Sequence, residues 1–186
     1  MKWSERLIAG ALARQVFASK HLVVVPNCTW TGDELDLLVV TADLRIIDVE
    51  VKISRADLRA DAKKDKWYHN WDWRIDGPYD KARREDRRRR EFPRKVWKHY
   101  YAMPKDLWND NLAAHLKAMT PRSGIILMSQ TVNGVILADV KHRSQPNLKA
   151  DKISAEDAIN LARLASLRMW DAYKEIDKLT ISRRTR

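Results

Sequence analysis

Three charged side chains occupy alternate positions in a short apolar segment: Asp48, Glu50 and Lys52. The segment, residues 45–53, has the composition of a β-strand, and successive side chains of a strand point to opposite faces. The three charges therefore share one face, and the other face is apolar, with Ile47, Val49, Val51 and Ile53. Because unpaired buried charge is costly, the charged face must meet something that compensates for the lost water.

A fourth charge, Asp36, lies on the preceding predicted strand, residues 35–41. A turn at residues 42–44, centred on Asp43, sets Asp36 directly across from Glu50. Opposed side chains of an antiparallel pair lie about 5 Å apart at Cβ, so both carboxylates can hold one divalent cation. A register shifted by one residue would turn Asp36 to the wrong face.

This arrangement suits the hydrolysis of a phosphodiester, which needs an activated water and neutralisation of the charge that develops on the phosphate. Mg²⁺ prefers oxygen ligands, and Mn²⁺ can substitute for it. We assign Asp36 and Glu50 as metal ligands, with the Val51 carbonyl as a third, and Lys52 as the group that positions the water or stabilises the phosphate. Asp48 is a candidate supporting group on the same face. The alternative is that Asp36, Glu50 and Lys52 form an edge-strand ion pair, which would contribute little at a surface.

These residues resemble a known pattern. Asp36 followed after a turn by Glu50-Val51-Lys52 resembles the PD-(D/E)XK nuclease superfamily, and the continuation through Asp61, with Lys64 and Trp67, is similar to the MmcB-like DNA-repair proteins within it. The resemblance implies a restriction-endonuclease-like αβββαβ core and a metal-dependent DNA endonuclease. Many relatives carry a further carboxylate on the first strand or helix. The first strand here offers Asn27 instead, and Glu5 on the first predicted helix is the substitute.

A helix is expected to follow Lys52 directly, from Arg55 toward Tyr68, with Ser54 as its N-cap. Asp57, Asp61 and Lys64 lie three or four residues apart and so share a face of that helix. Either this face is solvated and its acids pair with neighbouring Arg and Lys side chains, or one of the acids orients Lys52 or Lys64.

Residues 68–98 show no core periodicity and are interpreted as an insertion. Arginines beside exposed aromatics suit phosphate contact and base stacking, because each base offers a face to an aromatic ring. The alternative is a solvated surface with the tryptophans folded into the core. The nucleic-acid-binding candidates are Trp71, Trp73, Arg83, Arg84, Arg87, Arg88, Arg89 and Arg90.

The remaining segments complete an α/β pattern in one domain spanning residues 1–186. We expect a helix at 3–20, a strand at 21–27, a strand at 97–103, a helix at 107–119, a hairpin of 125–132 and 135–140 around Asn133-Gly134, and a final helix opened by Ser154 and Asp157. The apolar side of that helix is expected to comprise Ile159, Ala162, Leu164, Leu167, Trp170, Tyr173 and Ile176. The result is a mixed central sheet with an αβββαβ core, an extra hairpin and a C-terminal helix.

Composition narrows the class of protein. The chain of 186 residues has a formal net charge of +11, which favours a polyanionic partner such as DNA. The apolar runs are too short to span a membrane, and the start of the chain becomes acidic too early for a signal peptide. A single cysteine, Cys28, excludes an intrachain disulfide and a cysteine zinc cluster, and a reducing cytoplasm is the simplest compartment.

The sequence therefore predicts a Mg²⁺-dependent nuclease that cuts duplex or branched DNA in repair, recombination or phage DNA processing. Cutting both strands calls for two active sites, which a homodimer would supply. One alternative is a nucleic-acid-binding module on the same fold with weak or no catalysis, motivated by the missing first-strand carboxylate. Another is an RNA- or protein-directed module that docks through residues 83–90.

Overall fold

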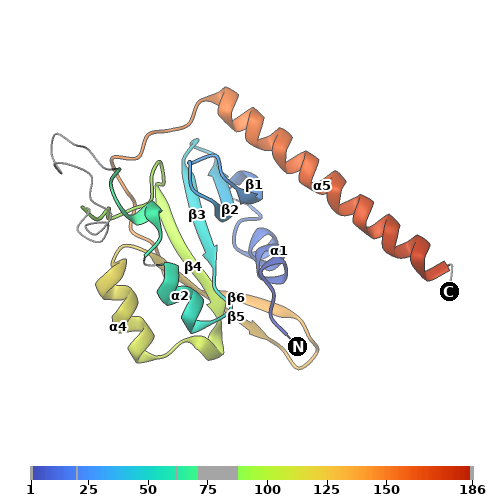
Figure 1. Cartoon of the computed structure of the whole chain (residues 1–186), viewed down its shortest axis with the longest axis horizontal. Coiled ribbons are helices and arrows are strands. Elements are labelled where there is room, and N and C mark those ends of the chain that lie inside the picture. The colour runs from blue at the N-terminus through green and yellow to red at the C-terminus, as the bar shows by residue number, and fades with distance from the viewer. Residues whose placement is uncertain (1, 20, 62, 71–87, 185–186) are drawn as a thin grey trace.

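The structure, a computed structural model, describes residues 2–19, 21–61, 63–70 and 88–184, with the backbone alone for 179–184. Within these ranges the chain forms helices and strands in a mixed order (Figure 1). In order they are α1 (Glu5–Gln15), β1 (His21–Cys28), β2 (Leu35–Thr41), β3 (Ile46–Val51), α2 (Arg55–Asp61), the 3₁₀ turn η1 (Asp65–Trp67), β4 (Lys98–Pro104), the 3₁₀ turn η3 (Lys105–Leu107), α4 (Asp110–Met119), β5 (Gly124–Gln130), β6 (Ile136–His142) and α5 (Ala155–Arg184).

The strands form one mixed six-stranded sheet in the order β1-β2-β3-β4-β5-β6. The first three strands pair antiparallel, β3, β4 and β5 pair parallel, and β6 returns antiparallel to β5. The expected αβββαβ order, followed by a hairpin and a C-terminal helix, is confirmed, and the protein is a mixed α/β fold.

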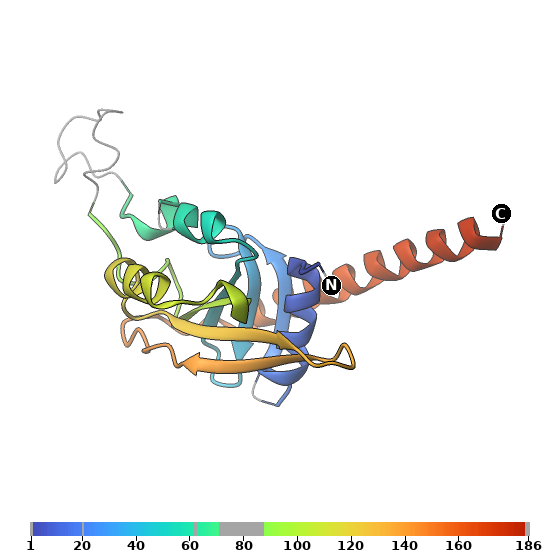
Figure 2. The same ribbon diagram turned by 90° about the horizontal axis from the view of Figure 1, so that it is seen from below.

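Helices cover both faces of the sheet (Figure 2). On one face α1 buries Ile8, Ala11 and Leu12 against alternate residues of β2 to β5. The opposite face carries two apolar clusters. One joins β1, β2 and the start of β3 to the first turns of α5, and the other joins β4 and β5 to α2 and α4.

The predicted β2–β3 register is confirmed. Leu37 lies opposite Val49 and Leu38 opposite Asp48, around the tight turn at residues 42–44. Leu44 adopts a left-handed conformation with φ 63°, and Thr41 binds Arg45 through both backbone and side chain, as expected for a three-residue hairpin loop. The alternation of faces follows from this register, so Ile47, Val49 and Val51 are buried beneath α1.

Several predicted boundaries were wrong. The first helix ends at Gln15 instead of Lys20, because the chain turns there and buries Phe17 in the α1 core. Strand β3 ends at Val51, and Ile53, which we expected on its apolar face, is 41% exposed. Helix α2 ends at Asp61 and does not continue toward Tyr68.

Helix α5 begins as expected: the Ser154 hydroxyl accepts the Asp157 N–H at 3.0 Å and donates to its carboxylate at 2.8 Å. The expected apolar side was largely wrong. Ala158 and Leu161 are buried and Leu164 is partly buried, whereas the other large members are exposed, because most of the helix extends beyond the sheet (Figure 1).

Only the ends of the 68–98 insertion are described. Tyr68 pairs with Arg89 in an antiparallel bridge that closes its base. The expectation that the segment lacks core residues was wrong at its C-terminal end, since Phe92 and Val96 are buried. Among the described residues, no helix is long and apolar enough to cross a membrane.

Candidate functional site

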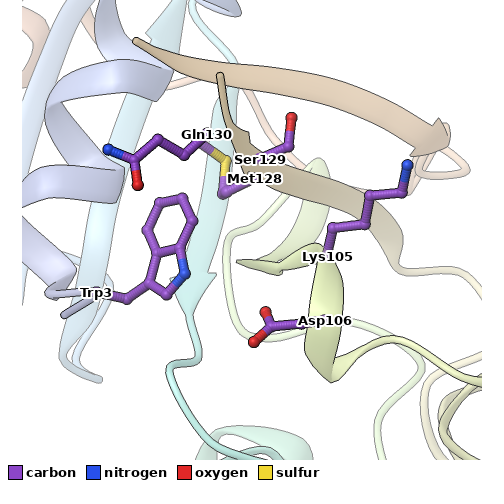
Figure 3. Close-up of a pocket in the computed structure, with 6 residues that line it drawn as sticks. All are labelled: Trp3, Lys105, Asp106, Met128, Ser129 and Gln130. Atoms are coloured by element: carbon purple, nitrogen blue, oxygen red, sulfur yellow. The ribbon is translucent and has the colours of Figure 1, made fainter. Parts of the chain in front are cut away.

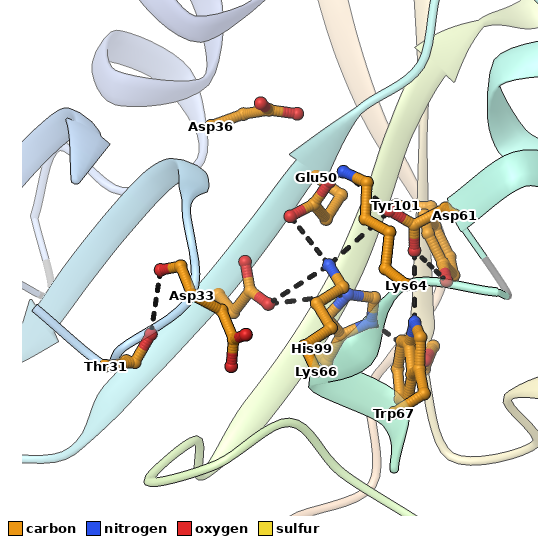
Figure 4. Close-up of polar contacts among 12 residues, drawn as sticks. Thr31, Asp33, Asp36, Glu50, Asp61, Lys64, Lys66, Trp67, His99 and Tyr101 are labelled. Atoms are coloured by element: carbon orange, nitrogen blue, oxygen red, sulfur yellow. Dashed lines mark hydrogen bonds and ion pairs between the residues drawn. The ribbon is translucent and has the colours of Figure 1, made fainter. Parts of the chain in front are cut away.

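The charged face of β3 lies between the two apolar clusters on the side of the sheet opposite α1. Lys52, directly after β3, is almost fully buried and donates to a Glu50 carboxylate oxygen at 2.7 Å. The same ammonium lies 4.0 Å from Asp36 Oδ2. The Lys52 ammonium therefore lies within 4.0 Å of both acids that the sequence selected, at the C-terminal end of β3. Figure 4 shows Asp36 and Glu50 together with Asp61, Lys64 and Lys66.

Asp36 holds the end of the β2–β3 pair together. Its Oδ2 accepts the Val51 N–H at 2.7 Å, so a side-chain hydrogen bond replaces the backbone pairing where β3 ends. Burial and the neighbouring Glu50 charge raise the pKa of Asp36 to about 6, against the lowering effects of the Val51 hydrogen bond and Lys52. Two acids this close repel unless a cation lies between them.

Asp61 is a central member of the site, and its contacts match the alternative in which one acid of α2 orients Lys52 or Lys64. The interpretation of its helix face as solvated was wrong for this residue, which is fully buried. Its Oδ1 lies 3.2 Å from Lys52 Nζ and 3.1 Å from Lys64 Nζ, and its Oδ2 accepts hydrogen bonds from Trp67 Nε1 and the Tyr101 hydroxyl. Burial acts to raise the pKa of Asp61, but Lys66, Lys52 and the other cations prevail and lower it.

Lys66 is a second buried ammonium group. It lies 2.6 Å from Glu50 Oε1, 3.6 Å from Asp61 Oδ1 and 3.8 Å from Asp48 Oδ2. The break after Asp61 explains this position, because an uninterrupted helix would place Lys66 five residues on from Asp61 and off its face. The turn and η1 instead bring both Lys64 and Lys66 back over β3.

The inner end of the site is built from Asp48 and His99. His99, opposite Asp48 on β4, is fully buried, with its Nδ1 2.8 Å from Ser123 Oγ and its Nε2 3.6 Å from Asp48 Oδ2. Burial and nearby Lys66 lower the pKa of His99 well below its usual value, so the imidazole is neutral. Burial raises the pKa of Asp48, partly offset by Lys66. Asp48 therefore lies at the buried end of the site, next to Lys66 and His99.

The other sequence candidates lie around the rim. Asp57 is partly exposed, with Oδ1 4.0 Å from Lys52 Nζ, and Lys64 Nζ is 3.4 Å from Glu50 Oε2. Glu5 is exposed in the first turn of α1, close enough to Asp36 for its charge to raise the pKa of that carboxyl. We call Asp36, Asp48, Glu50, Lys52, Asp61, Lys64 and Lys66 the charged cluster.

The proposed DNA-contacting residues are only partly described. Trp71, Trp73, Arg83, Arg84 and Arg87 lie outside the described residues. Arg88 is exposed, whereas Arg89 lies over the rings of Trp67 and Tyr68 and the Arg90 Nε donates to the Tyr68 carbonyl at 2.9 Å. The Trp67 ring is fully buried, as the alternative interpretation of the tryptophans expected.

Two residues of the site carried a signal that the sequence analysis did not use. His99 and Tyr101 alternate on the predicted strand after the insertion, so they share a face, and the parallel register sets them beside Asp48 and Glu50. The alternation of His99 and Tyr101 on one strand matches the alternation of Asp48 and Glu50 on its neighbour, and this match could have placed the four side chains together. Lys66 carried none, because its position depends on where α2 ends.

A magnesium ion fits this site in ligand chemistry but meets competition there. The Asp36 and Glu50 carboxylates are suitable oxygen ligands, and burial together with the Glu50 charge raises the pKa of Asp36, a cost that a bound cation would reduce. Against this, each Glu50 oxygen already contacts a lysine ammonium. Within the described ranges no group of three or more His, Cys, Asp or Glu side chains is arranged to hold a metal.

A separate hollow of about 430 Å³ lies near the N-terminus of α1, lined by Trp3, Lys105, Asp106, Met128, Ser129 and Gln130 (Figure 3). Met128 belongs to the core on the α1 side of the sheet, whereas Glu50 shares the opposite face with Tyr101. The hollow and the charged cluster therefore lie on opposite sides of the sheet.

Comparison with known proteins bears on the fold. No family model and no curated protein matches the chain. Among solved structures it is similar to SPO1766, a protein of unknown function from Silicibacter pomeroyi, with a TM-score of 0.53 and 16% identity over 95% of this chain and 94% of that one. At this identity the likeness shows a shared fold over nearly the full length of both chains.

Proposed function

We propose that the chain is a metal-dependent DNA endonuclease of the PD-(D/E)XK type, acting on duplex or branched DNA in repair, recombination or phage DNA processing. The observation that carries the proposal is the convergence of Asp36, Glu50 and Lys52: Lys52 Nζ lies 2.7 Å from one carboxylate and 4.0 Å from the other. The net charge of +11 supports a polyanionic substrate. A free, buried Cys28 is consistent with activity in the cytoplasm.

Asp36, Glu50 and the Val51 carbonyl would hold the magnesium ion, or manganese in its place. When bound, the ion would activate water and neutralise charge on the scissile phosphate. Half-exposed Lys64 can leave Glu50 and make room for it, since its side chain is 47% exposed.

Lys52 acts in this proposal as a fixed positive charge. Burial acts to lower the pKa of Lys52, but Glu50, Asp61 and Asp36 outweigh it and raise the pKa above its usual value. A lysine that stays protonated cannot take a proton from water. Its part is therefore to hold the phosphate oxygens and stabilise the charge that grows on them as water adds to phosphorus and the sugar oxygen leaves.

The deciding experiment is a cleavage panel of linear, nicked, flapped and four-way DNA, with RNA alongside, in Mg²⁺, Mn²⁺ or EDTA. We expect metal-dependent cleavage by the wild type. Lys52→Ala, Asp36→Asn and Glu50→Gln should each lose roughly 100-fold or more, the usual cost of removing one charge-stabilising group. Asp139→Asn, an exposed carboxylate on β6, is the matched control and should cleave normally. Full activity in all three site variants would refute the proposal.

A second candidate is a nucleic-acid-binding module without catalysis. It is favoured by one observation: Lys52, Lys64 and Lys66 all contact Glu50, so the carboxylate is neutralised without a metal. Binding without cleavage across the whole panel would select this candidate.

A further inference from the structure

Helix α5 is much longer than the surface that it covers. Its 30 residues give a length of about 45 Å. The part that packs on the sheet is the first third, where Ala158 and Leu161 are buried and Leu164 and Ala165 are partly buried. The rest extends away from the body in both views (Figures 1 and 2).

An apolar stripe follows the free side of this helix. At about 100° per residue, its members fall within an arc of roughly 100°, centred about 120° from the packed face. Its large side chains are well exposed: Ile159 68%, Trp170 58%, Tyr173 51% and Met169 46%. The rings of Trp170 and Tyr173 contact each other at 5.8 Å between centroids. We define the α5 stripe as Ile159, Ala162, Ser166, Met169, Trp170 and Tyr173.

We propose that the α5 stripe binds the same stripe of a second copy of the chain, with the two helices antiparallel. The proposal is independent of the nuclease assignment. A contiguous exposed apolar surface on a helix marks an interaction site, and a two-fold axis requires the surface to complement itself.

The order of large and small residues provides that complementarity. Large rings occupy the C-terminal half of the stripe and small side chains occupy the N-terminal half. An antiparallel copy centred between residues 167 and 168 sets Met169 over the partner's Ser166, and Tyr173 over the partner's Ala162. A parallel copy would instead set ring against ring and leave a gap between the two alanines.

Charge also favours the antiparallel arrangement. Each copy carries a net charge of +11, so two bodies side by side would repel each other. Because the body packs on the first turns of α5, antiparallel helices place the two bodies at opposite ends of the pair.

The contact is small for a stable dimer. Four half-exposed large side chains, with the small residues between them, can bury roughly 500 Å² per partner, below the roughly 800 Å² of a standard interface. We therefore expect a dimer that forms and dissociates with concentration.

The first test measures the mass of the full chain by sedimentation equilibrium from about 5 to about 200 µM, in about 0.5 M NaCl to prevent bridging by nucleic acid. The mass should rise from 21.8 kDa toward twice that value. Trp170→Glu and Tyr173→Glu should stay monomeric, and glutamate favours a helix more than either ring does. Leu167→Glu is the matched control, because Leu167 is 52% exposed on the same helix but about 120° from the centre of the stripe.

The second test fixes the orientation by oxidation of single added cysteines; the native Cys28 is buried. In the antiparallel pair the two copies of residue 166 lie roughly 5 Å apart along the axis, and the two copies of residue 162 roughly 17 Å apart. Ser166→Cys should form a disulfide-linked dimer and Ala162→Cys should not.

Three results would overturn the proposal. The first is a monomer at every concentration, which would leave the stripe to another kind of partner. The second is equal dissociation by Leu167→Glu and Trp170→Glu. The third is cross-linking of Ala162→Cys as fast as Ser166→Cys, which would show parallel helices.

Discussion

At the scale of single residues, the site is a balance of buried charges. Glu50, Asp48 and Asp61 are fully buried acids, and Lys52 and Lys66 are nearly fully buried bases. Removing one partner of such a group leaves a buried charge without compensation, which costs far more than the intact pair contributes. Predictions for individual side chains follow from this asymmetry.

Asp36→Asn should stabilise the metal-free fold while lowering cleavage by roughly 100-fold or more. The folded pKa of about 6 exceeds the ordinary value of 3.8, so the folded protein disfavours the ionised carboxylate. That cost is absent below about pH 4 and complete above about pH 6, so the variant should gain about 1–3 kcal/mol near pH 8 and nothing near pH 4. Urea unfolding in EDTA at both pH values measures it.

Added Mg²⁺ provides the complementary measurement on the same pair of proteins. A ligand that binds the folded state stabilises it, so magnesium should raise the unfolding midpoint of the wild type and not that of Asp36→Asn. Equal effects of magnesium on both proteins would place the ion elsewhere.

Lys66→Met should destabilise the fold by about 3–5 kcal/mol, because Glu50, Asp48 and Asp61 lose the ammonium that compensates them. Lys63→Met, an exposed lysine of the same turn, should stay within about 0.5 kcal/mol of wild type. Chemical denaturation near neutral pH compares the two. A loss below about 1 kcal/mol for Lys66→Met would show that other cations replace it.

At the scale of elements, the break between α2 and η1 builds the site as much as the strands do. Strand β3 presents the acids, and the turn after Asp61 returns two lysines to them. On the α1 face of the sheet the parallel strands pack closely, and Gly124, at the start of β5, lies against the Tyr100 ring of β4.

Gly124→Ala should destabilise the fold by about 1–3 kcal/mol through overpacking. A Cβ there would collide with the Tyr100 ring and come within 2.6 Å of the Ser144 backbone nitrogen. Gly10→Ala in α1 is the contrast, since its Cβ would meet the flexible Arg14 side chain at 3.4 Å. It should stabilise the helix by about 0.5–1 kcal/mol. Thermal and urea unfolding of the two variants should therefore shift in opposite directions.

At the scale of the whole molecule, a net charge of +11 predicts binding dominated by phosphate contacts. The affinity for duplex DNA should fall by at least roughly 100-fold between about 50 and about 200 mM NaCl. Fluorescence anisotropy with labelled duplexes of two unrelated sequences measures it, and Lys52→Ala should bind nearly as wild type. A flat salt dependence would contradict the prediction, and a preference for RNA at matched salt would redirect the search for substrate.

The sequence by itself determined the order of the elements, the β2–β3 register and the convergence of Asp36, Glu50 and Lys52. The physical reason is that strand periodicity and turn length are local, and a hairpin of fixed register places its side chains without help from the rest of the chain. The capping of α1 and α5 was equally local.

Only the tertiary structure decided which charged residues are buried together and which apolar residues stay exposed to solvent. The sequence left Asp61 as either a surface acid or a partner of Lys52 or Lys64, and the structure encloses it with Lys66, Trp67 and Tyr101 at the end of α2. Trp170 and Tyr173 looked like core until α5 proved longer than the sheet beneath it. Burial depends on what other elements cover a residue, and no local pattern contains that information.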